Sequence, residues 1–341
     1  MRMLGLASLL LAALGCQIDN AEYSPPRDGM VAGDDGPGNP AGDLGTPVLS
    51  DGGGTDLTAP ATGAQSPPYP LETSSTTEGD ATFVAFVPVL PGAAKAPLVI
   101  WKHGFQLATS NYEALLRAVA EQGFVVIGVD TAGGFFNPPS NVDEQQAMLA
   151  GLDWALKDAP FASRVDVTRV AVGGHSRGGK VAVMAAAADD RVDAVLLLDP
   201  VNGCGPGQGY SDSCPDITQP AWAGALALPV GVMGETNNAK GGLSPCAPEK
   251  QNYATIFKAL TKATWAVSWT FTGADHMDFT DDGGGVVGGL CADGPGDDAT
   301  IRKDVRALAL AFFLRHLLGQ NASDAVLTGA SLPAGIVVEG P

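Results

Sequence analysis

The sequence predicts an α/β fold, with a mostly parallel central sheet and helices on both of its faces. From about residue 67, short apolar runs rich in β-branched residues alternate with stretches of helical spacing, as is typical of parallel sheets. Apolar residues make up 45% of the 341 residues and charged residues only 16%, which is ample for a packed core. No internal repeat interrupts the pattern, so we expect one catalytic domain over 67–320 and a tail over 321–341.

The individual elements follow from the apolar spacing. Buried strands are short runs dominated by Val, Ile and Leu, and helices are longer runs with apolar residues three or four apart. The expected strands are 82–88, 97–101, 124–129, 170–172, 194–198, 229–233 and 265–271. The expected helices are 112–122, 142–157, 180–188 and 301–318, and 335–339 is a possible edge strand after them.

Residues 1–16 have the pattern of a secretory signal. One basic residue precedes an apolar run that ends in small residues, and the run is too short to span a bilayer as a mature helix. Ala13-Leu14-Gly15-Cys16 also resembles a bacterial lipobox, in which the cysteine becomes lipidated. We therefore expect an exported protein, secreted or held at the cell envelope by a lipid on Cys16, with the membrane touched only through that anchor.

Residues 17–66 are expected to be an extended linker. They contain ten Gly, six Pro and eight Asp or Glu against one basic residue, Arg27. Such a composition buries too little apolar surface to offset the entropy lost on ordering. The whole chain has a net charge of -18, which disfavours binding to nucleic acid, and we expect a monomer.

Four cysteines follow Cys16, and an exported protein meets an oxidising compartment. Of the three possible pairings we expect Cys204 with Cys214 and Cys246 with Cys291. A zinc site is the alternative, but the CxxC spacings typical of such sites do not occur here.

Gly174-His175-Ser176-Arg177-Gly178 lies between the strand at 170–172 and the helix that begins near 178. The five-residue pattern alone is weak, because chance supplies it in a glycine-rich chain. In a strand-to-helix turn it is strong, since such a turn admits only small neighbours and presents the serine hydroxyl. In this context the segment resembles the nucleophile elbow of α/β-hydrolases, so Ser176 is the expected nucleophile.

A serine nucleophile needs a base, and the chain has four histidines. We expect the His175 ring to point away, His316 to be structural, and His103 to end a strand. His276 follows the last strand, in the chain order of α/β-hydrolases, and is the expected base. A metal site is an alternative interpretation of the acidic residues beside it: Asp275, Asp278, Asp281 and Asp282.

Two acids could orient this histidine. Asp199 ends the first strand after the elbow and Glu235 ends the next, and we favour Asp199 because it follows a long apolar run. The oxyanion hole needs two backbone N–H groups. We expect them from Arg177, directly after the nucleophile, and from Phe105 in the loop after the strand at 97–101.

With these segments placed, the sequence resembles the chlorophyllases and the bacterial cutinase-like polyester hydrolases, both near the dienelactone hydrolase branch. The resemblance covers roughly residues 80–280. The chlorophyllase pattern recurs in order and implies Ser176, Asp199 and His276 as the triad. In the cutinase-like group Met follows the nucleophile and the acid lies on the later strand, where this chain has Glu235. The segments that carry the resemblance are 103–105, 122–127, 174–179, 199–201 and 276–278.

The expected function is cleavage of carboxylic esters through an acyl-enzyme, without metal or organic cofactor. The substrate would be a small or polymeric ester, with Phe105 and Trp222 as candidate contacts for its acyl group. Polyester or lipid hydrolysis is an alternative within this class. A non-catalytic binding lipoprotein with the same fold, and a peptidase with the same triad, are alternatives outside it.

Overall fold

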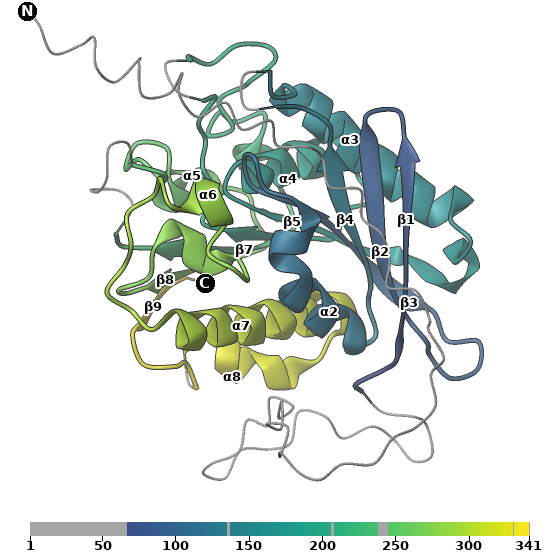
Figure 1. Cartoon of the computed structure of the whole chain (residues 1–341). Helices are drawn as coiled ribbons and strands as arrows, with labels where there is room; N and C mark the ends of the chain where they lie inside the picture. Colours follow the sequence, from purple (N-terminus) through teal and green to yellow (C-terminus); the bar gives the residue numbers. More distant parts are fainter. Residues whose placement is uncertain (1–66, 135–136, 206–207, 238–244, 330, 341) are drawn as a thin grey trace, which may run out of the picture. The chain divides into compact units, whose positions relative to one another are not determined.

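The computed structural model describes residues 67–340 apart from 135–136, 206–207, 238–244 and 330 (Figure 1). The expectations for the signal at 1–16, for Cys16 and for the linker at 17–66 lie outside the described residues. Within the described part of the chain, no helix combines the length and the apolar character that crossing a bilayer requires.

The described residues form one sheet of nine strands in the order β1-β2-β4-β3-β5-β6-β7-β8-β9. The strands from β4 to β8 in this order are parallel, and β1, β2 and β9 join antiparallel at the two edges. Parallel neighbours end at the same edge of a sheet, so the loops after β3, β5, β6, β7 and β8 gather there. The strands are β1 (Leu71–Glu78), β2 (Ala81–Pro88), β3 (Ala96–Lys102), β4 (Val125–Thr131), β5 (Val165–His175), β6 (Ala194–Leu198), β7 (Pro229–Glu235), β8 (Trp265–Phe271) and β9 (Ile336–Glu339).

Helices cover both faces of the sheet (Figure 1). Helices α3, α4 and α5 pack on one face, and α2 and α7 pack on the other. Alternate side chains of each central strand enter the two cores, which is why these strands consist of unbroken apolar runs. The helices are α2 (Glu113–Glu121), α3 (Asn141–Asp153), α4 (Arg177–Ala188), α5 (Tyr253–Ala259), α6 (Gly285–Gly288), α7 (Asp298–Leu318) and α8 (Asp324–Leu327).

Local sequence explains where the two helices beside the nucleophile begin. Ser140 caps α3, because its hydroxyl accepts the N–H of Asp143 at 3.1 Å and the Asp143 carboxylate accepts from Ser140 in return. Helix α4 is built largely from Gly, Ala and Val, and nearly all of it is buried. Small side chains let α4 lie close to the strands, which fixes the segment after the nucleophile.

The predicted fold class is confirmed, since every expected strand and helix is present. The strand expected at 170–172 is longer and reaches the nucleophile, and the helix expected at 142–157 ends in a π-helical turn at Trp154–Asp158. The possible edge strand near the C-terminus is β9, which pairs with β8. Strand β1 and helix α5 were not predicted; β1 reads as polar because its side chains are mostly exposed.

Candidate active site

Ser176 stands in a tight turn between β5 and α4. Its φ of 55° and ψ of -123° define a conformation that residues with a side chain rarely adopt. A Cβ at Gly178 would lie 2.2 Å from the carbonyl oxygen of Lys102, and one at Gly174 would lie 2.5 Å from the backbone of Gly178. Glycine at these two positions therefore lets the start of α4 pass directly against the end of β3.

His276 lies between Ser176 and Asp199. Its Nε2 is 2.8 Å from the Ser176 Oγ, and its Nδ1 is 2.6 Å from Oδ2 of Asp199. The histidine begins a short 3-10 turn after β8, and Asp275 caps this turn by accepting the N–H of Met277 at 2.8 Å. The structure thus brings together the three side chains that the sequence predicted as nucleophile, base and acid.

Asp199 directly follows β6 and is fully buried. Burial raises the pKa of the Asp199 carboxyl, and the hydrogen bond from His276 opposes that rise. Glu235, the alternative acid, ends β7 and accepts a hydrogen bond from the backbone N–H of Asn237. Of the two acids, Asp199 is the one hydrogen-bonded to the imidazole.

Strained backbone is concentrated at this site. Among the described residues, the non-glycine positions with positive φ are Gln106 at 55°, Ser176 at 55° and Asp199 at 35°. Each such conformation costs about 1–3 kcal/mol and persists only where the surrounding structure enforces it. The three positions lie in the loop expected to carry an oxyanion donor, at the elbow and at the acid, which indicates a functional site.

The loop after β3 lies against the elbow. A Cβ at Gly104 would be 3.3 Å from the Cβ of Ser176. The guanidinium of Arg177 lies over the ring of Phe105, with its carbon 5.7 Å from the ring centroid. The two residues expected to supply oxyanion N–H groups, Phe105 and Arg177, are therefore neighbours at the nucleophile.

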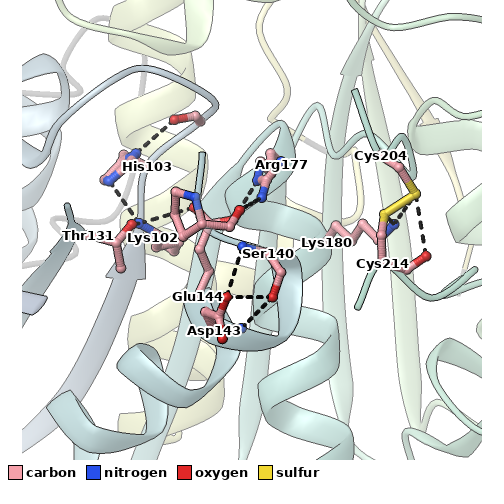
Figure 2. Close-up of polar contacts among 12 residues, drawn as sticks. Lys102, His103, Thr131, Ser140, Asp143, Glu144, Arg177, Lys180, Cys204 and Cys214 are labelled. Atoms are coloured by element: carbon pink, nitrogen blue, oxygen red, sulfur yellow. Dashed lines mark hydrogen bonds and ion pairs between the residues drawn. A yellow bond between two sulfur atoms is a disulfide. The ribbon is translucent and has the colours of Figure 1, made fainter. Parts of the chain in front are cut away.

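A buried charged cluster of Lys102, Glu144 and Arg177 lies beside the elbow, on the α3 face of the sheet (Figure 2). Oε2 of Glu144 accepts a hydrogen bond from Nε of Arg177, and Oε1 lies 3.6 Å from Nζ of Lys102. The Arg177 guanidinium also donates to the carbonyl of Pro139. Because Lys102 ends β3 and Arg177 begins α4, one carboxylate joins the segments that carry both expected oxyanion donors.

Lys102 also determines the tautomer of the neighbouring His103. Its Nζ donates to the carbonyl of Val129 at 3.2 Å, to the hydroxyl of Thr131 at 3.0 Å and to Nε2 of His103 at 2.7 Å. An ammonium group only donates, so Nδ1–H of His103 is left to donate to the carbonyl of Gly104 at 2.7 Å. Desolvation lowers the pKa of Lys102 to about 8 and that of His103 to about 4.

His175 was expected to point away from the nucleophile, and both of its ring nitrogens bond to groups other than the Ser176 hydroxyl, but its ring lies against the imidazole of His276. The Nε2 of His175 lies 2.9 Å from the carbonyl oxygen of His276, and the two imidazole rings are 4.6 Å apart between centroids. Its Nδ1 lies 2.7 Å from the hydroxyl of Tyr112. Side chains alternate along a strand, and His175 faces the side of α2 and α7, where the loop that carries His276 also packs.

The two expected acyl contacts have different surroundings. Phe105 lies at the elbow, beside Arg177. Trp222 is half-buried and packs against the apolar core on the α3 and α4 face. The structure therefore places Phe105 at the site and gives Trp222 a packing role.

Both expected disulfides are present. Cys204 pairs with Cys214 in the loop after β6, and Cys246 pairs with Cys291, which ties the segment after β7 to the segment that follows His276. Nζ of Lys180, in α4, lies 3.1 Å from Sγ of Cys214 (Figure 2). The two crosslinks hold loops at the edge of the sheet where Ser176 lies.

The acidic residues around the histidine form turn caps. Asp278 accepts the N–H of Asp275 at 2.9 Å, and Asp281 accepts an N–H from the first turn of α2 at 2.6 Å. Asp282 accepts the N–H of Gly284 at 2.9 Å. Within the described ranges, no three His, Cys, Asp or Glu side chains gather as metal ligands do.

Comparison with known families gives the class of this chain. The sequence model of the family described as chlorophyllase matches residues 68–334. The chain belongs to the chlorophyllase family. Chlorophyllase-1 of Arabidopsis thaliana is 29% identical over 251 residues, which cover 67% of this chain and 75% of the relative.

Bacterial esterases match shorter parts of the chain. Bis(hydroxyethyl) terephthalate hydrolase of Streptomyces coelicolor is 30% identical over 138 residues, 40% of this chain and 39% of the relative. Cutinase est2 of Thermobifida alba is 34% identical over 99 residues, 28% of this chain and 32% of the relative. The family and these relatives place the chain among ester hydrolases of the chlorophyllase and cutinase type.

Sequence reasoning did not identify Tyr112 or Glu144 as parts of this site. Both are buried polar side chains on helical segments far in sequence from the nucleophile. The available signal was Lys102, a charge at the end of a buried strand, because a buried ammonium requires a partner elsewhere in the fold.

Proposed function

We propose that this protein is an exported serine carboxylesterase that cleaves its substrate through an acyl-enzyme. The observation that carries the proposal is the position of His276, hydrogen-bonded to both the Ser176 hydroxyl and the buried Asp199 carboxylate at a strained elbow. Nucleophile, base and orienting acid in this relation are the requirements of acyl transfer by a serine.

In the first half-reaction, the Ser176 Oγ attacks the ester carbonyl carbon while His276 Nε2 takes the hydroxyl proton. The oxyanion of the tetrahedral intermediate accepts hydrogen bonds from the backbone N–H groups of Phe105 and Arg177. The bond to the alkoxy oxygen then breaks, and His276 returns the proton to that oxygen. The alcohol leaves and the acyl group stays on Ser176.

In the second half-reaction, water takes the place of the alcohol. His276 accepts a proton from the water as its oxygen attacks the acyl carbon, and then gives that proton to the departing Ser176 Oγ. Asp199 keeps Nδ1–H of the imidazole directed toward itself and stabilises the imidazolium in both steps. The acid product leaves, and the enzyme returns to its starting state.

Labelling with a fluorophosphonate probe tests the serine mechanism. The wild-type protein should be labelled, Ser176→Ala should not, and Ser268→Ala, which removes another buried serine hydroxyl, should be labelled normally. A folded wild-type protein that stays unlabelled would favour a binding lipoprotein of the same fold. An anilide of the same acyl group, assayed beside the ester, distinguishes a peptidase from an esterase.

For the substrate we propose an extended or polymeric carboxylic ester. The relatives include a bis(hydroxyethyl) terephthalate hydrolase and cutinases as well as chlorophyllases, and an enzyme displayed outside the cell meets insoluble esters. A panel of p-nitrophenyl esters of rising chain length, bis(hydroxyethyl) terephthalate, a polyester film and chlorophyll tests this choice. Turnover of chlorophyll alone would contradict it.

Export is supported by two disulfides, because such bonds persist in oxidising compartments. The apolar run before Cys16 supports lipid anchoring. Labelling of the expressing cells with a radioactive fatty acid should mark the wild-type protein and should not mark Cys16→Ser. Equal labelling of both, or of neither, would contradict the anchor.

A further inference from the structure

A buried chain of hydrogen bonds that takes no part in the proposed proton transfers runs from Gly104 to His276. The N–H of Gly104 meets the hydroxyl of Tyr112 at 3.1 Å, and that hydroxyl meets Nδ1 of His175 at 2.7 Å. Nε2 of His175 meets the carbonyl oxygen of His276 at 2.9 Å. Tyr112 and His175 are both fully buried, so water cannot replace these contacts.

The direction of every bond in this chain is determined by its two ends. The Gly104 amide can only donate, and the His276 carbonyl can only accept. Burial holds the pKa of His175 well below its usual value, so the ring is neutral and carries one N–H. That hydrogen must lie on Nε2, facing the carbonyl, and Nδ1 therefore accepts the O–H of Tyr112.

The chain connects two separate loops of the site. Gly104 precedes Phe105 in the loop after β3, which supplies the first proposed oxyanion donor, and His276 is the proposed base. A Cβ at Gly104 would lie 3.2 Å from Nδ1 of His175, so that loop rests directly on the imidazole. The His175 ring also packs against the ring of His276.

We infer that Tyr112 and His175 are positioning residues that hold the oxyanion loop and the His276 loop at a fixed separation around Ser176. The inference rests on the proposed function. Neither side chain exchanges a proton with substrate. Their contribution is geometric, because an oxyanion hole stabilises the transition state only when its donors stand where the negative charge develops.

Loss of this positioning should slow the chemical step more than it weakens substrate binding. Donors that are displaced by a fraction of an ångström bind the ground-state ester almost as well and the oxyanion less well, which lowers kcat and leaves KM nearly unchanged. Deleting a whole oxyanion donor costs on the order of 100- to 1,000-fold in kcat. For a loosened loop we expect a smaller loss, about 10-fold.

Three variants separate the parts of the chain. Tyr112→Phe keeps the ring and removes the hydroxyl. His175→Gln keeps a side-chain N–H that can reach the His276 carbonyl, and His175→Asn keeps an oxygen that can accept from Tyr112. The matched controls are Tyr253→Phe, which removes a hydroxyl bonded to Thr270 at 3.0 Å, and His316→Gln in α7.

The measurement is kcat and KM on a p-nitrophenyl ester, together with the melting temperature of each variant. We expect kcat about 10-fold lower at unchanged KM for Tyr112→Phe and His175→Asn, and wild-type kcat for both controls. His175→Gln, which keeps a donor to the His276 carbonyl, should lose less kcat than His175→Asn. The double variant Tyr112→Phe/His175→Asn should lose much less than the product of the two single losses, because both act through one chain.

The inference would be overturned by a kcat for Tyr112→Phe equal to that of wild type, or by multiplicative losses in the double variant. Loss of kcat only in proportion to loss of folded protein would also contradict it, since that indicates a purely structural role. The variant Ser176→Ala distinguishes failure of the proposed serine mechanism from failure of this inference. If that variant keeps full esterase activity, the serine mechanism is wrong whatever Tyr112 and His175 do.

Discussion

Two buried polar networks flank the nucleophile on opposite faces of the sheet, and they are built from different chemistry. On the α3 face, the carboxylate of Glu144 joins two cations, Lys102 and Arg177. On the α2 and α7 face, Tyr112 and His175 form a neutral chain of hydrogen bonds. The charged network holds Lys102 at the end of β3, and the neutral network holds Gly104 in the loop that follows.

The charged cluster and the neutral chain hold the same region of the site by different means. Buried ions cost several kcal/mol each to desolvate, so the charged cluster is stable only while all of its members are present. A neutral chain carries a smaller desolvation cost, and the loss of one member leaves one or two polar groups unpaired. We therefore expect the charged cluster to dominate stability, and the neutral chain to affect mainly the rate of catalysis.

The largest effect on stability is expected from Glu144→Ala, which leaves the buried Lys102 and Arg177 without their carboxylate. We expect a loss of about 3–5 kcal/mol in the free energy of unfolding, measured by urea denaturation. The control is Glu113→Ala, which removes an exposed carboxylate paired with Arg117 and should cost less than about 1 kcal/mol. Equal losses in the two variants would contradict the importance of the buried charged cluster for stability.

A smaller effect is expected from Arg177→Lys, which keeps the backbone N–H and one positive charge. Lysine lacks the planar group that donates to both Glu144 and Pro139 and lies over Phe105, so we expect a loss of about 1–2 kcal/mol in stability.

Arg117→Lys is the matched control, because Arg117 also pairs with a carboxylate and lies over a phenylalanine ring, but at the surface. It should be nearly neutral by the same urea titration. If Arg177→Lys costs no more stability than Arg117→Lys, the planar guanidinium of Arg177, which donates to two acceptors, is unimportant.

The two networks also differ in the pH range in which they change stability. Burial lowers the pKa of Lys102 from 10.5 to about 8, so between these pH values the unfolded chain holds a proton that the folded chain has released. Stability should therefore rise with pH in this window, by up to about 1.4 kcal/mol per pH unit for one group. Lys180, also lowered to about 8, contributes to the same rise.

The neutral chain of Tyr112 and His175 affects stability at acid pH instead. The pKa of His175 lies well below its usual 6.5, so below about pH 6.5 only the unfolded chain takes up the proton and stability falls with falling pH. Urea midpoints across pH 5 to 10 measure both slopes. His175→Gln should reduce the acid loss and leave the alkaline rise unchanged. Lys102→Met should reduce the alkaline rise and also change the acid loss, because the charge of Lys102 lowers the pKa of its neighbour His103. If His175→Gln changed the alkaline slope, the two networks would not be independent.

The fold and the three central residues of the site were predictable because they follow from local patterns. Parallel strands are continuous apolar runs, the elbow has a glycine signature, and His276 remains after the other histidines are assigned. The disulfide pairs were predictable because few pairings were possible. Asp199 and Glu235 stayed open, since the sequence places both at the same sheet edge without giving the direction of either side chain.

The two networks were not predictable, because they depend on contacts between distant segments. Glu144 reads as a charge in the first turn of a helix, which is ordinary at a surface. The sequence pattern indicates only that Tyr112 is an apolar position at the start of a helix. The role of its hydroxyl depends on Gly104 and His175, which lie beside it only in the folded structure. Strand β1 has polar side chains and is specified by its pairing with β2.

Asp199, and not Glu235, is the acid that we propose orients His276 for proton transfer with Ser176. The most direct test is kcat/KM of Asp199→Asn and Glu235→Gln on one p-nitrophenyl ester. Because Asn cannot hold the imidazole in the required tautomer, Asp199→Asn should lower kcat/KM by about 10,000-fold. We expect Glu235→Gln to stay within about 10-fold of wild type. A larger loss in Glu235→Gln than in Asp199→Asn would contradict the account.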